Sequence, residues 1–392
     1  MESTRTTFVI PSTLRGCQFL SFHILYSASQ HVVCIILFCL IFNYLVEFAI
    51  SRPTRVKVPV LGYRYMLEPT WFVRLRFVWT GGSIVRDGYE RFRSSIFQIR
   101  KLGTDIVIIP PNYIDEVRKL SKDKTRSVEP FIDDFAGKYT HGMTFLQSDL
   151  QNIVIQKKLT PRLAQLTIAM QEELDLALSL EMPMMTEYIE PLRQEMIIAL
   201  ADGGWQKTTL NRLYKLDSLL KESQRLSPVF LRGCPIEPHY YYLYTDNKVV
   251  TFNRIFHEPI NLSDGTHLPS GTRIAVPSHA MLQDPLHVPG RSPPTKFDAF
   301  RYSALREESD ATSKYHFSMT DSSNMAFGYG KYACPGRFYA SNEMKIVLTT
   351  LLLRYDFKFR DGKGRPKNIT IDSDMFPDPR ARLCVRLRSP VN

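Results

Sequence analysis

The sequence predicts an α+β fold that is mainly helical and carries one small β-sheet. Two long segments, 161–180 and 208–226, have apolar residues at spacings of three and four, which is typical of amphipathic helices. Between residues 252 and 277 the pattern changes to short extended pieces, separated by the turn sequences SDGT and PSGT. With 392 residues, of which 44% are hydrophobic, the chain can bury a substantial core.

The N-terminal region contains an apolar run at residues 32–50, VVCIILFCLIFNYLVEFAI. Its 19 residues are close to the roughly 20 that a helix needs to cross a bilayer. Arg52, Arg55 and Lys57 follow the run, and positive charge beside a span tends to stay on the cytosolic side. We therefore expect a membrane anchor within residues 1–51 and a cytosolic domain over residues 52–392. A buried helix of the globular domain is the main alternative, and a mitochondrial presequence is less favoured.

The elements that follow are indicated by local signals. The apolar run TDIVIIPP stops at residues 110–111, which predicts a buried strand, and NYIDEVRKL predicts a short helix capped by Asn112. Thr160 and Pro161 mark the expected start of the helix at 161–180. Apolar residues recur at helical spacing from residue 337 onward, so we expect a last long helix there.

Charge and cysteine usage limit the possible classes of partner. The net charge is +11, but Lys and Arg are spread along the chain, so we expect an acidic protein partner or an anionic membrane surface and no nucleic acid. The six cysteines include no CxxC pair, which indicates neither a disulfide framework nor a zinc cluster. They are Cys17, Cys34, Cys39, Cys234, Cys334 and Cys384.

One of these cysteines lies in the stretch FGYGKYACPG, residues 327–336. Gly328, Gly330 and Gly336 would let the main chain approach a flat and bulky ligand, and Phe327 would supply an aromatic wall. Backbone N–H groups of the turn and the start of the next helix would stabilise a thiolate at Cys334. A single cysteine thiolate is the protein ligand of haem iron in enzymes that split the O–O bond.

The same stretch resembles the haem-binding signature of the cytochrome P450 monooxygenases, F-x-x-G-x-x-x-C-x-G. All four fixed positions match, as Phe327, Gly330, Cys334 and Gly336. The resemblance implies a cytochrome P450 fold, with Cys334 as the axial ligand of the iron of haem b. It also implies electrons that come from NADPH through a reductase.

Two further haem contacts are implied by this resemblance. Arg254, in FNRIFHEPI, resembles the arginine with which the family binds a haem propionate. At position 332 the family often has an arginine or a histidine, whereas this chain has Tyr332. A phenol would give a propionate one hydrogen bond but no charge.

A group of three charged residues also matches the family. Glu222 and Arg225 stand three apart in KESQRL, so they lie on one face of the predicted helix and can form an ion pair. The family has a Glu-x-x-Arg pair at this place, and Arg301 in FDAFRY matches the arginine that completes its structural triad.

Longer segments are similar to fungal ent-kaurene oxidases, the membrane-bound cytochromes P450 of gibberellin biosynthesis. They include RKLGTDIVIIPPNYIDEVRKL, LSDGTHLPSGTRIAVPSHAMLQDP and SSNMAFGYGKYACPGRFYASNEMK. The similarity implies stepwise oxidation of a methyl group of a diterpene, ent-kaurene, to a carboxylic acid with molecular oxygen. It also implies an NADPH-cytochrome P450 reductase as partner and a single-pass anchor in the endoplasmic reticulum membrane.

The chain departs from the family in two places. Where the family has a long central helix that binds oxygen, this chain has only EMPMMTE, the seven residues 181–187, although crossing a domain takes roughly 20 helical residues. Residues 231–250 form an insertion instead. No catalytic residue can therefore be assigned. Both departures are expected from a gene-structure or splicing error; a catalytically impaired remnant and an oxidase of another terpenoid are the other hypotheses.

Overall fold

The computed structural model describes residues 31–42, 44–45, 56–65, 68–134, 137, 139–140, 142–148, 150–164, 166, 188–226, 247–308, 313–359, 369–372, 374–376 and 383–388. The chain divides into two compact units, Met1–Arg55 and Val56–Asn392. In the first unit, residues 31–42 and 44–45 are helical and most of their apolar side chains are exposed.

The predicted membrane anchor falls only partly on described residues. Its last part, residues 46–50, lies outside them. Among the helices that the structure describes, none combines the length and the apolar character needed to cross a membrane.

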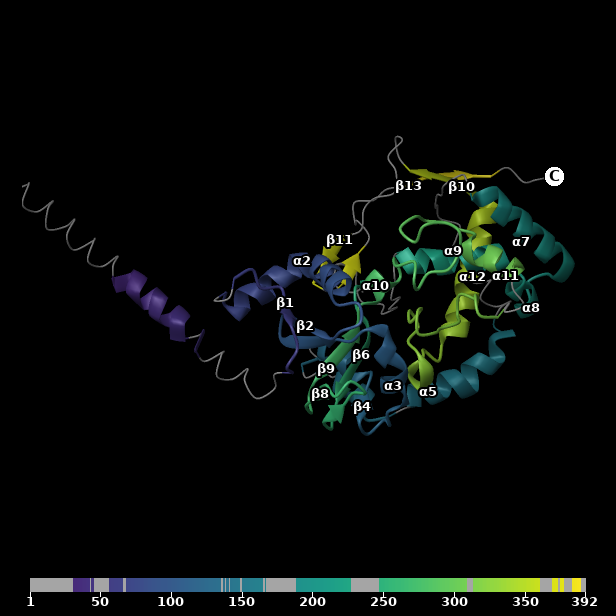
Figure 1. The fold of residues 1–392 in the computed structure, drawn as a ribbon. Coiled ribbons are helices and arrows are strands. Elements are labelled where there is room, and N and C mark those ends of the chain that lie inside the picture. The colour runs from purple at the N-terminus through teal and green to yellow at the C-terminus, as the bar shows by residue number, and fades with distance from the viewer. Residues whose placement is uncertain are drawn as a thin grey trace, which may run out of the picture. The chain divides into compact units, whose positions relative to one another are not determined.

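The second unit is built on a six-stranded mixed sheet with the strand order β1-β2-β3-β9-β6-β4 (Figure 1). β1 runs parallel to β2 and β3 runs parallel to β9, whereas the other neighbours are antiparallel. The run TDIVIIPP forms β3, as predicted. The strands are β1 (Val60–Leu61), β2 (Phe97–Lys101), β3 (Thr104–Ile108), β4 (Thr125–Arg126), β6 (Thr251–Phe256) and β9 (Arg273–Val276).

The small antiparallel sheet predicted between residues 252 and 277 is confirmed. β6 pairs antiparallel with β9, and a short hairpin lies between them in the sequence. Gly265 and Gly271, in the two expected turns, have φ values of +85° and +80°, which glycine adopts readily. The remaining strands of the described residues are β7 (Ile260–Asn261) with β8 (His267–Leu268), β10 (Tyr355–Phe359) with β13 (Leu383–Leu387), and β5 (Asn247–Lys248) with β11 (Ile369–Ile371) and β12 (Asp374–Phe376).

Helices cover the sheet and form a second part of this unit. Figure 1 shows α2 beside the sheet and α7, α8, α9, α11 and α12 gathered together away from it. The predicted mixture of helix and sheet is confirmed, but the described residues contain four separate sheets in place of the one small sheet that was expected, and the largest has six strands. The α-helices are α2 (Thr70–Arg91), α3 (Ile114–Lys119), α4 (Glu129–Asp134), α5 (Leu150–Val154), α7 (Ile189–Gly203), α8 (Lys207–Asn211), α9 (Tyr214–Leu226), α10 (Ser278–Met281), α11 (Arg301–Glu307) and α12 (Arg337–Arg354).

Three clusters of buried apolar side chains hold these elements together. One lies between α2 and the sheet, and a second joins the sheet to α3 and to Met325. The third is the core of the helical part and contains Ile346, Leu351 and Leu352 of α12. The cysteine-containing stretch follows Met325 and precedes α12, so it connects the sheet-side core with the helical core.

The predicted helix at 208–226 is in fact two helices, α8 and α9, which are separated at Arg212 and Leu213. The cause is a carboxylate from another helix. Glu195 of α7 accepts hydrogen bonds from the backbone N–H groups of Lys215 (2.7 Å) and Leu216 (3.1 Å), and so caps the start of α9. No sequence pattern within 208–226 contains this contact.

Two predicted helix starts are also wrong. α3 begins after a 3₁₀ turn at Pro111–Tyr113, so Tyr113, and not Asn112, takes the capping position. The helical segment around Pro161 begins at Leu150, and Pro161 lies inside a 3₁₀ turn, Thr160–Arg162. The hydroxyl of Thr160 donates to the carbonyl of Ile155 (2.9 Å), which keeps this turn joined to the preceding one. Residues 167–180 of the predicted helix lie outside the described residues.

The two predicted departures from the family lie mostly outside the described residues. This holds for all of 181–187 and for 231–246. The end of the expected insertion is described: Asn247–Lys248 forms β5 and pairs with β12.

The end of α12 offers a test of the packing in the helical core. Arg193 of α7 is buried and donates to the carbonyls of Leu352 and Tyr355, each at 2.7 Å, and to Asp356 at 2.9 Å. Arg193→Met should lower the free energy of unfolding by about 2 kcal/mol, because these acceptors lose a charged donor. Arg212→Met, which removes an exposed pair with Asp202 and a long hydrogen bond of 3.5 Å to the carbonyl of Ala199, should cost at most about 1 kcal/mol. Urea denaturation measures both, and equal losses would contradict the expectation.

Candidate functional site

The stretch Phe327–Gly336 is a tight loop closed by backbone hydrogen bonds. The N–H of Cys334 donates to the carbonyl of Phe327 at 2.7 Å, and the N–H of Gly328 donates to Met325 at 2.8 Å. Gly330–Tyr332 forms a 3₁₀ turn inside the loop. We call residues 327–336 the Cys334 loop. Its closing bond fixes the cysteine opposite Phe327.

Two of the three glycines in this loop have the conformation that only glycine adopts easily. Gly328 and Gly330 have φ values of +73° and +67°. A Cβ on Gly328 would lie 2.8 Å from the carbonyl oxygen of Tyr332, so this position also requires a close approach of two backbone segments. Gly336 differs from the expectation, because its φ of −89° is open to any residue. A Cβ there would meet only Ile155, at 3.7 Å.

The Cys334 side chain is half-buried at the start of α12. Arg337, the first residue of α12, donates from Nη1 to the carbonyl oxygen of Cys334 at 2.9 Å. Phe327 packs edge-on against Phe317, with ring centroids 5.3 Å apart. The loop is thus held on both sides of the cysteine.

Arg254 of β6 is buried, with 4% of its surface exposed, yet two of its nitrogens lack a partner. Nη1 donates to the carbonyl of Asn253 at 2.7 Å, whereas Nε and Nη2 find no acceptor among the described residues. Its guanidinium lies over the rings of Phe252 (4.2 Å) and Tyr332 (4.6 Å). Burial lowers the pKa of Arg254 to about 10, so it stays charged at neutral pH. A buried cation with two free donors is suited to bind an anion.

Tyr332 ties the Cys334 loop to the sheet. Its hydroxyl donates to the backbone carbonyl of Thr125 on β4 at 2.8 Å. Its ring lies against the guanidinium of Arg254. The hydrogen bond expected from Tyr332 to a propionate stays a prediction.

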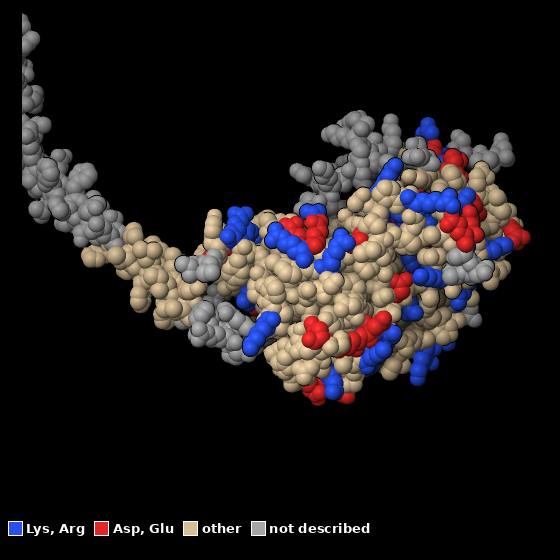
Figure 2. Space-filling view, in the orientation of Figure 1, with Lys and Arg blue, Asp and Glu red and all other residues tan. Residues whose placement is uncertain are grey.

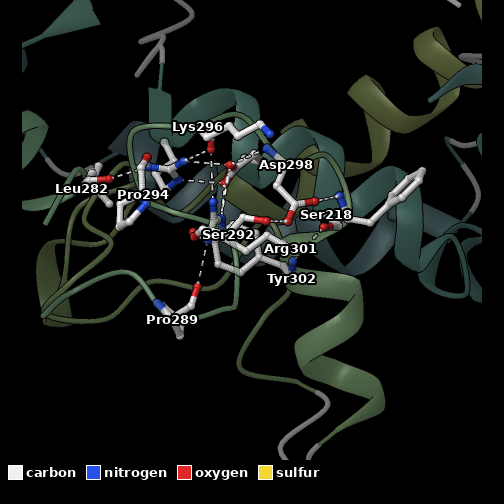
Figure 3. Close-up of polar contacts among 12 residues, drawn as sticks. Ser218, Leu282, Pro289, Ser292, Pro294, Lys296, Asp298, Arg301 and Tyr302 are labelled. Atoms are coloured by element: carbon white, nitrogen blue, oxygen red, sulfur yellow. Dashed lines mark hydrogen bonds and ion pairs between the residues drawn. The ribbon is translucent and has the colours of Figure 1, made fainter. Parts of the chain in front are cut away.

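The three charged residues of the predicted triad meet in the interior, and Figure 3 shows the polar contacts around Arg301. Arg225 donates from Nε and Nη2 to the two carboxylate oxygens of Glu222, both at 2.7 Å, and Nε of Arg301 lies 3.3 Å from both oxygens. All three side chains are almost completely buried. The N–H of Asp298 adds a further hydrogen bond to Glu222, at 3.0 Å.

The two arginines of this group also fix an irregular segment of backbone. Arg225 donates to the carbonyls of Leu282 (2.6 Å) and Pro294 (2.5 Å), and Arg301 donates to those of Ser292 (2.6 Å) and Pro293 (3.1 Å). The segment between α10 and α11 is thereby anchored to α9, which compensates for its lack of regular backbone hydrogen bonds.

Basic and acidic side chains are interspersed on the face of the molecule that Figure 2 shows. This agrees with the even spread of Lys and Arg along the sequence. Within the described residues, no group of three His, Cys, Asp or Glu side chains could hold a metal ion.

Comparison with known proteins identifies the family. A model of the cytochrome P450 family matches residues 247–385. The chain is 47% identical over 489 aligned positions to the ent-kaurene oxidase P450-4 of Gibberella fujikuroi, and the alignment covers 87% of this chain and 94% of that protein. The chain belongs to the cytochrome P450 family. The predicted family, its class of oxidoreductase, a monooxygenase, and the similarity to fungal ent-kaurene oxidases are confirmed.

Other cytochromes P450 give the same result. The ent-kaurene oxidase of Fusarium fujikuroi is 47% identical over 489 positions, which cover 87% of this chain and 90% of that protein. A cytochrome P450 monooxygenase of Emericella nidulans is 29% identical over 503 positions, which cover 88% and 90%. These alignments are longer than the 392 residues of the chain. The relatives therefore contain residues that have no counterpart here.

The residues of this cytochrome P450 fit the haem that its family carries. The two unpaired donors of Arg254 match a propionate, which brings the missing negative charge. The Cys334 loop offers one half-buried thiol as an axial ligand. A haem propionate would thus neutralise the buried Arg254, which otherwise has no anionic partner among the described residues.

The sequence did not point to three residues that shape this cytochrome P450 site. Phe252 stacks on Arg254 and has a φ of +56°, a conformation that costs a non-glycine residue about 1–3 kcal/mol. Phe252 stands two residues before Arg254 in the same strand. Residues at this spacing share one face of a sheet, so the spacing could have predicted that the two side chains are neighbours. Phe317, and Thr125 through its carbonyl, gave no local signal, because their contacts are long-range.

Replacing Arg254 should change haem affinity and apoprotein stability in different ways. Arg254→Met should lower the affinity of the apoprotein for haem about tenfold, because a charged partner of the propionate is lost. The same change should leave the stability of the apoprotein unchanged or raise it, since it removes a buried cation with two unpaired donors. Haem titration and urea denaturation measure the two effects. Arg126→Met, on the exposed side of β4, is the control, and equal haem affinities of the two variants would refute the role.

Proposed function

We propose that this cytochrome P450 is a haem-thiolate monooxygenase that oxidises a diterpene. The proposal rests on two buried N–H groups of Arg254 that have no hydrogen-bond acceptor within the described part of the chain. The guanidinium of this arginine lies over the ring of Tyr332, which belongs to the Cys334 loop. A cation of this kind beside a single loop-held cysteine matches a haem with its propionate and its thiolate ligand. When bound, haem b supplies the activation of molecular oxygen.

In this proposal each residue of the site has one task. Cys334 would bind the haem iron through its thiolate, and the hydrogen bond from its backbone N–H to the carbonyl of Phe327 holds the backbone of this cysteine. Arg254 binds a propionate, and the rings of Phe252 and Tyr332 keep its guanidinium in one orientation. Gly328 and Gly330 adopt the positive φ values that the tight turn of the Cys334 loop requires.

The group Glu222, Arg225 and Arg301 has a structural task in the same proposal. It contacts backbone carbonyls of the segment 282–296 and the start of α11. From α11 the chain runs towards the Cys334 loop. The triad thus holds the connection between the sheet and the loop in place, without touching the cofactor.

The proposed substrate is ent-kaurene, oxidised at a methyl group to a carboxylic acid. The support is the 47% identity to two proteins named ent-kaurene oxidase, over nearly their full length. The electrons would come from NADPH through a cytochrome P450 reductase. We also propose that the apolar run at residues 32–50 anchors the protein in the endoplasmic reticulum membrane, with residues 52–392 in the cytosol.

A second candidate function concerns this form of the chain. The alignments with its relatives extend over 489 positions, whereas the chain has 392 residues. We propose that the missing residues include the central helix, at the short segment 181–187, which would leave the thiolate side of the site without its oxygen-binding side. Such a form would bind haem and fail to turn over. The family match begins at residue 247, so most of the expected insertion at 231–250 lies outside it.

Haem binding itself is tested by replacing the ligand. Cys334→Ala should abolish the strongly red-shifted Soret band of the reduced, carbon monoxide-bound protein, because that band requires a thiolate ligand of the haem iron. Cys384→Ala, which alters another half-buried cysteine in β13, should keep the band. A wild-type chain without the band, or a Cys334→Ala variant that retains it, would show the assignment to be wrong.

Turnover separates the two candidate functions. Microsomes that contain this chain and a working reductase are incubated with ent-kaurene, and products are followed by mass spectrometry. An active oxidase should form hydroxylated and carboxylated products that depend on NADPH. A chain that shows the haem-thiolate band but gives no product is the non-catalytic form.

A further inference from the structure

A second buried charge cluster lies on α9, close to the triad. Its centre is Asp217, which is 1% exposed. One carboxylate oxygen forms an ion pair with Nζ of Lys345 at 2.6 Å, and the other accepts the backbone N–H of Phe317 at 2.9 Å. Asp217 therefore contacts one residue that precedes the Cys334 loop and one that follows it.

A histidine and an arginine also face this carboxylate. Nδ1 of His316 lies 3.3 Å and Nη1 of Arg306 lies 3.4 Å from the same oxygen that accepts Phe317. Burial alone would raise the pKa of Asp217, but His316 and Lys345 outweigh it and lower the pKa to about 2. The carboxylate is thus charged at any pH at which the protein would be studied.

The contact upstream of the loop leads directly to the cysteine. Phe317, whose N–H is bonded to Asp217, packs its ring against the ring of Phe327 at 5.3 Å. The carbonyl of Phe327 in turn accepts the N–H of Cys334 at 2.7 Å. A second buried residue of α9, Lys221, reinforces this side by donating to the carbonyl of His316 at 3.1 Å.

The contact downstream fixes the helix that carries the other end of the loop. Lys345 lies in α12, which begins directly after the loop at Arg337. Besides its ion pair with Asp217, Lys345 donates to the carbonyl of Leu210 in α8 at 3.1 Å. Arg337 holds the carbonyl of Cys334 at 2.9 Å. A shift of α12 along its axis would therefore move the cysteine.

We infer that Asp217 is a positioning residue for Cys334. A single charged carboxylate binds both flanks of the loop, so neither flank can move without exposing or unpairing a charge in the interior. The separation of the flanks then determines where the cysteine is held. The consequence for haem ligation rests on the proposed function, whereas the effect on the loop does not.

The first test uses the full chain without cofactor. Asp217→Asn keeps the size of the side chain and an acceptor for Phe317 but loses the charge that holds Lys345. Amide hydrogen exchange should become roughly tenfold faster at residues 313–319 and 327–337, because local opening no longer breaks a buried ion pair. Exchange in α2, which lies in a separate core, should stay as in the wild type.

Glu68→Gln is the matched control. Glu68 is also a buried carboxylate that binds one cation, Arg76, and one backbone N–H, that of Arg64, but it lies beside α2 and not beside the loop. This variant should leave exchange at 313–319 and 327–337 unchanged. If Asp217→Asn does not fold, Phe317→Leu tests the same path, with faster exchange expected at 327–337.

The second test measures whether Cys334 binds the haem iron. In the haem-loaded protein, Asp217→Asn should lower the share of the carbon monoxide complex that shows the thiolate-type Soret band, whereas Glu68→Gln should keep it. Unchanged exchange at both flanks in Asp217→Asn, or an equal acceleration throughout residues 56–388 in both variants, would overturn the inference. A wild-type chain that binds no haem would refute the proposed function alone, because the exchange comparison does not need the cofactor.

Discussion

The interaction on which the rest of this structure depends is the ion group between Glu222, Arg225 and Arg301. A carboxylate with no exposed surface is stable only because two guanidinium groups and a backbone N–H surround it. The remaining donors of the arginines bind carbonyls of the segment between α10 and α11. This segment has little regular structure, so α9 supplies the rigidity that a helix or strand would otherwise give it. This constraint fixes the start of α11, because Arg301 is its first residue.

Local sequence patterns predicted the parts of the fold that depend on neighbouring residues. The spacing of Glu222 and Arg225 predicted their pairing, and the apolar runs predicted β3 and α12. The resemblance of the Cys334 loop to a known signature predicted the family. Contacts between distant segments could not be predicted in this way. Glu195 divides a predicted helix into α8 and α9, although it belongs to α7.

The same limit applies to the individual residues of the candidate site. The family pattern suggested a propionate contact for Tyr332, but no local pattern indicated that its hydroxyl donates to the carbonyl of Thr125. Gly336 matches the signature, yet its backbone angle does not require a glycine. Arg254 matched a family position, and only its burial between two rings shows why it lacks partners of its own. These properties arise from tertiary packing, which a linear pattern does not record.

The Cys334 loop joins the sheet-side core to the helical core, and this has a consequence for how the protein folds. Thr125, Arg254 and Tyr332, which meet at the site, lie in three widely separated segments of the chain. Closing loops of this length costs entropy before any contact is gained, so such contacts form late in folding. The contacts around the Cys334 loop can therefore assemble only after both cores exist. Incorporation of the cofactor would then report that the chain has folded throughout, and incompletely folded molecules would remain colourless.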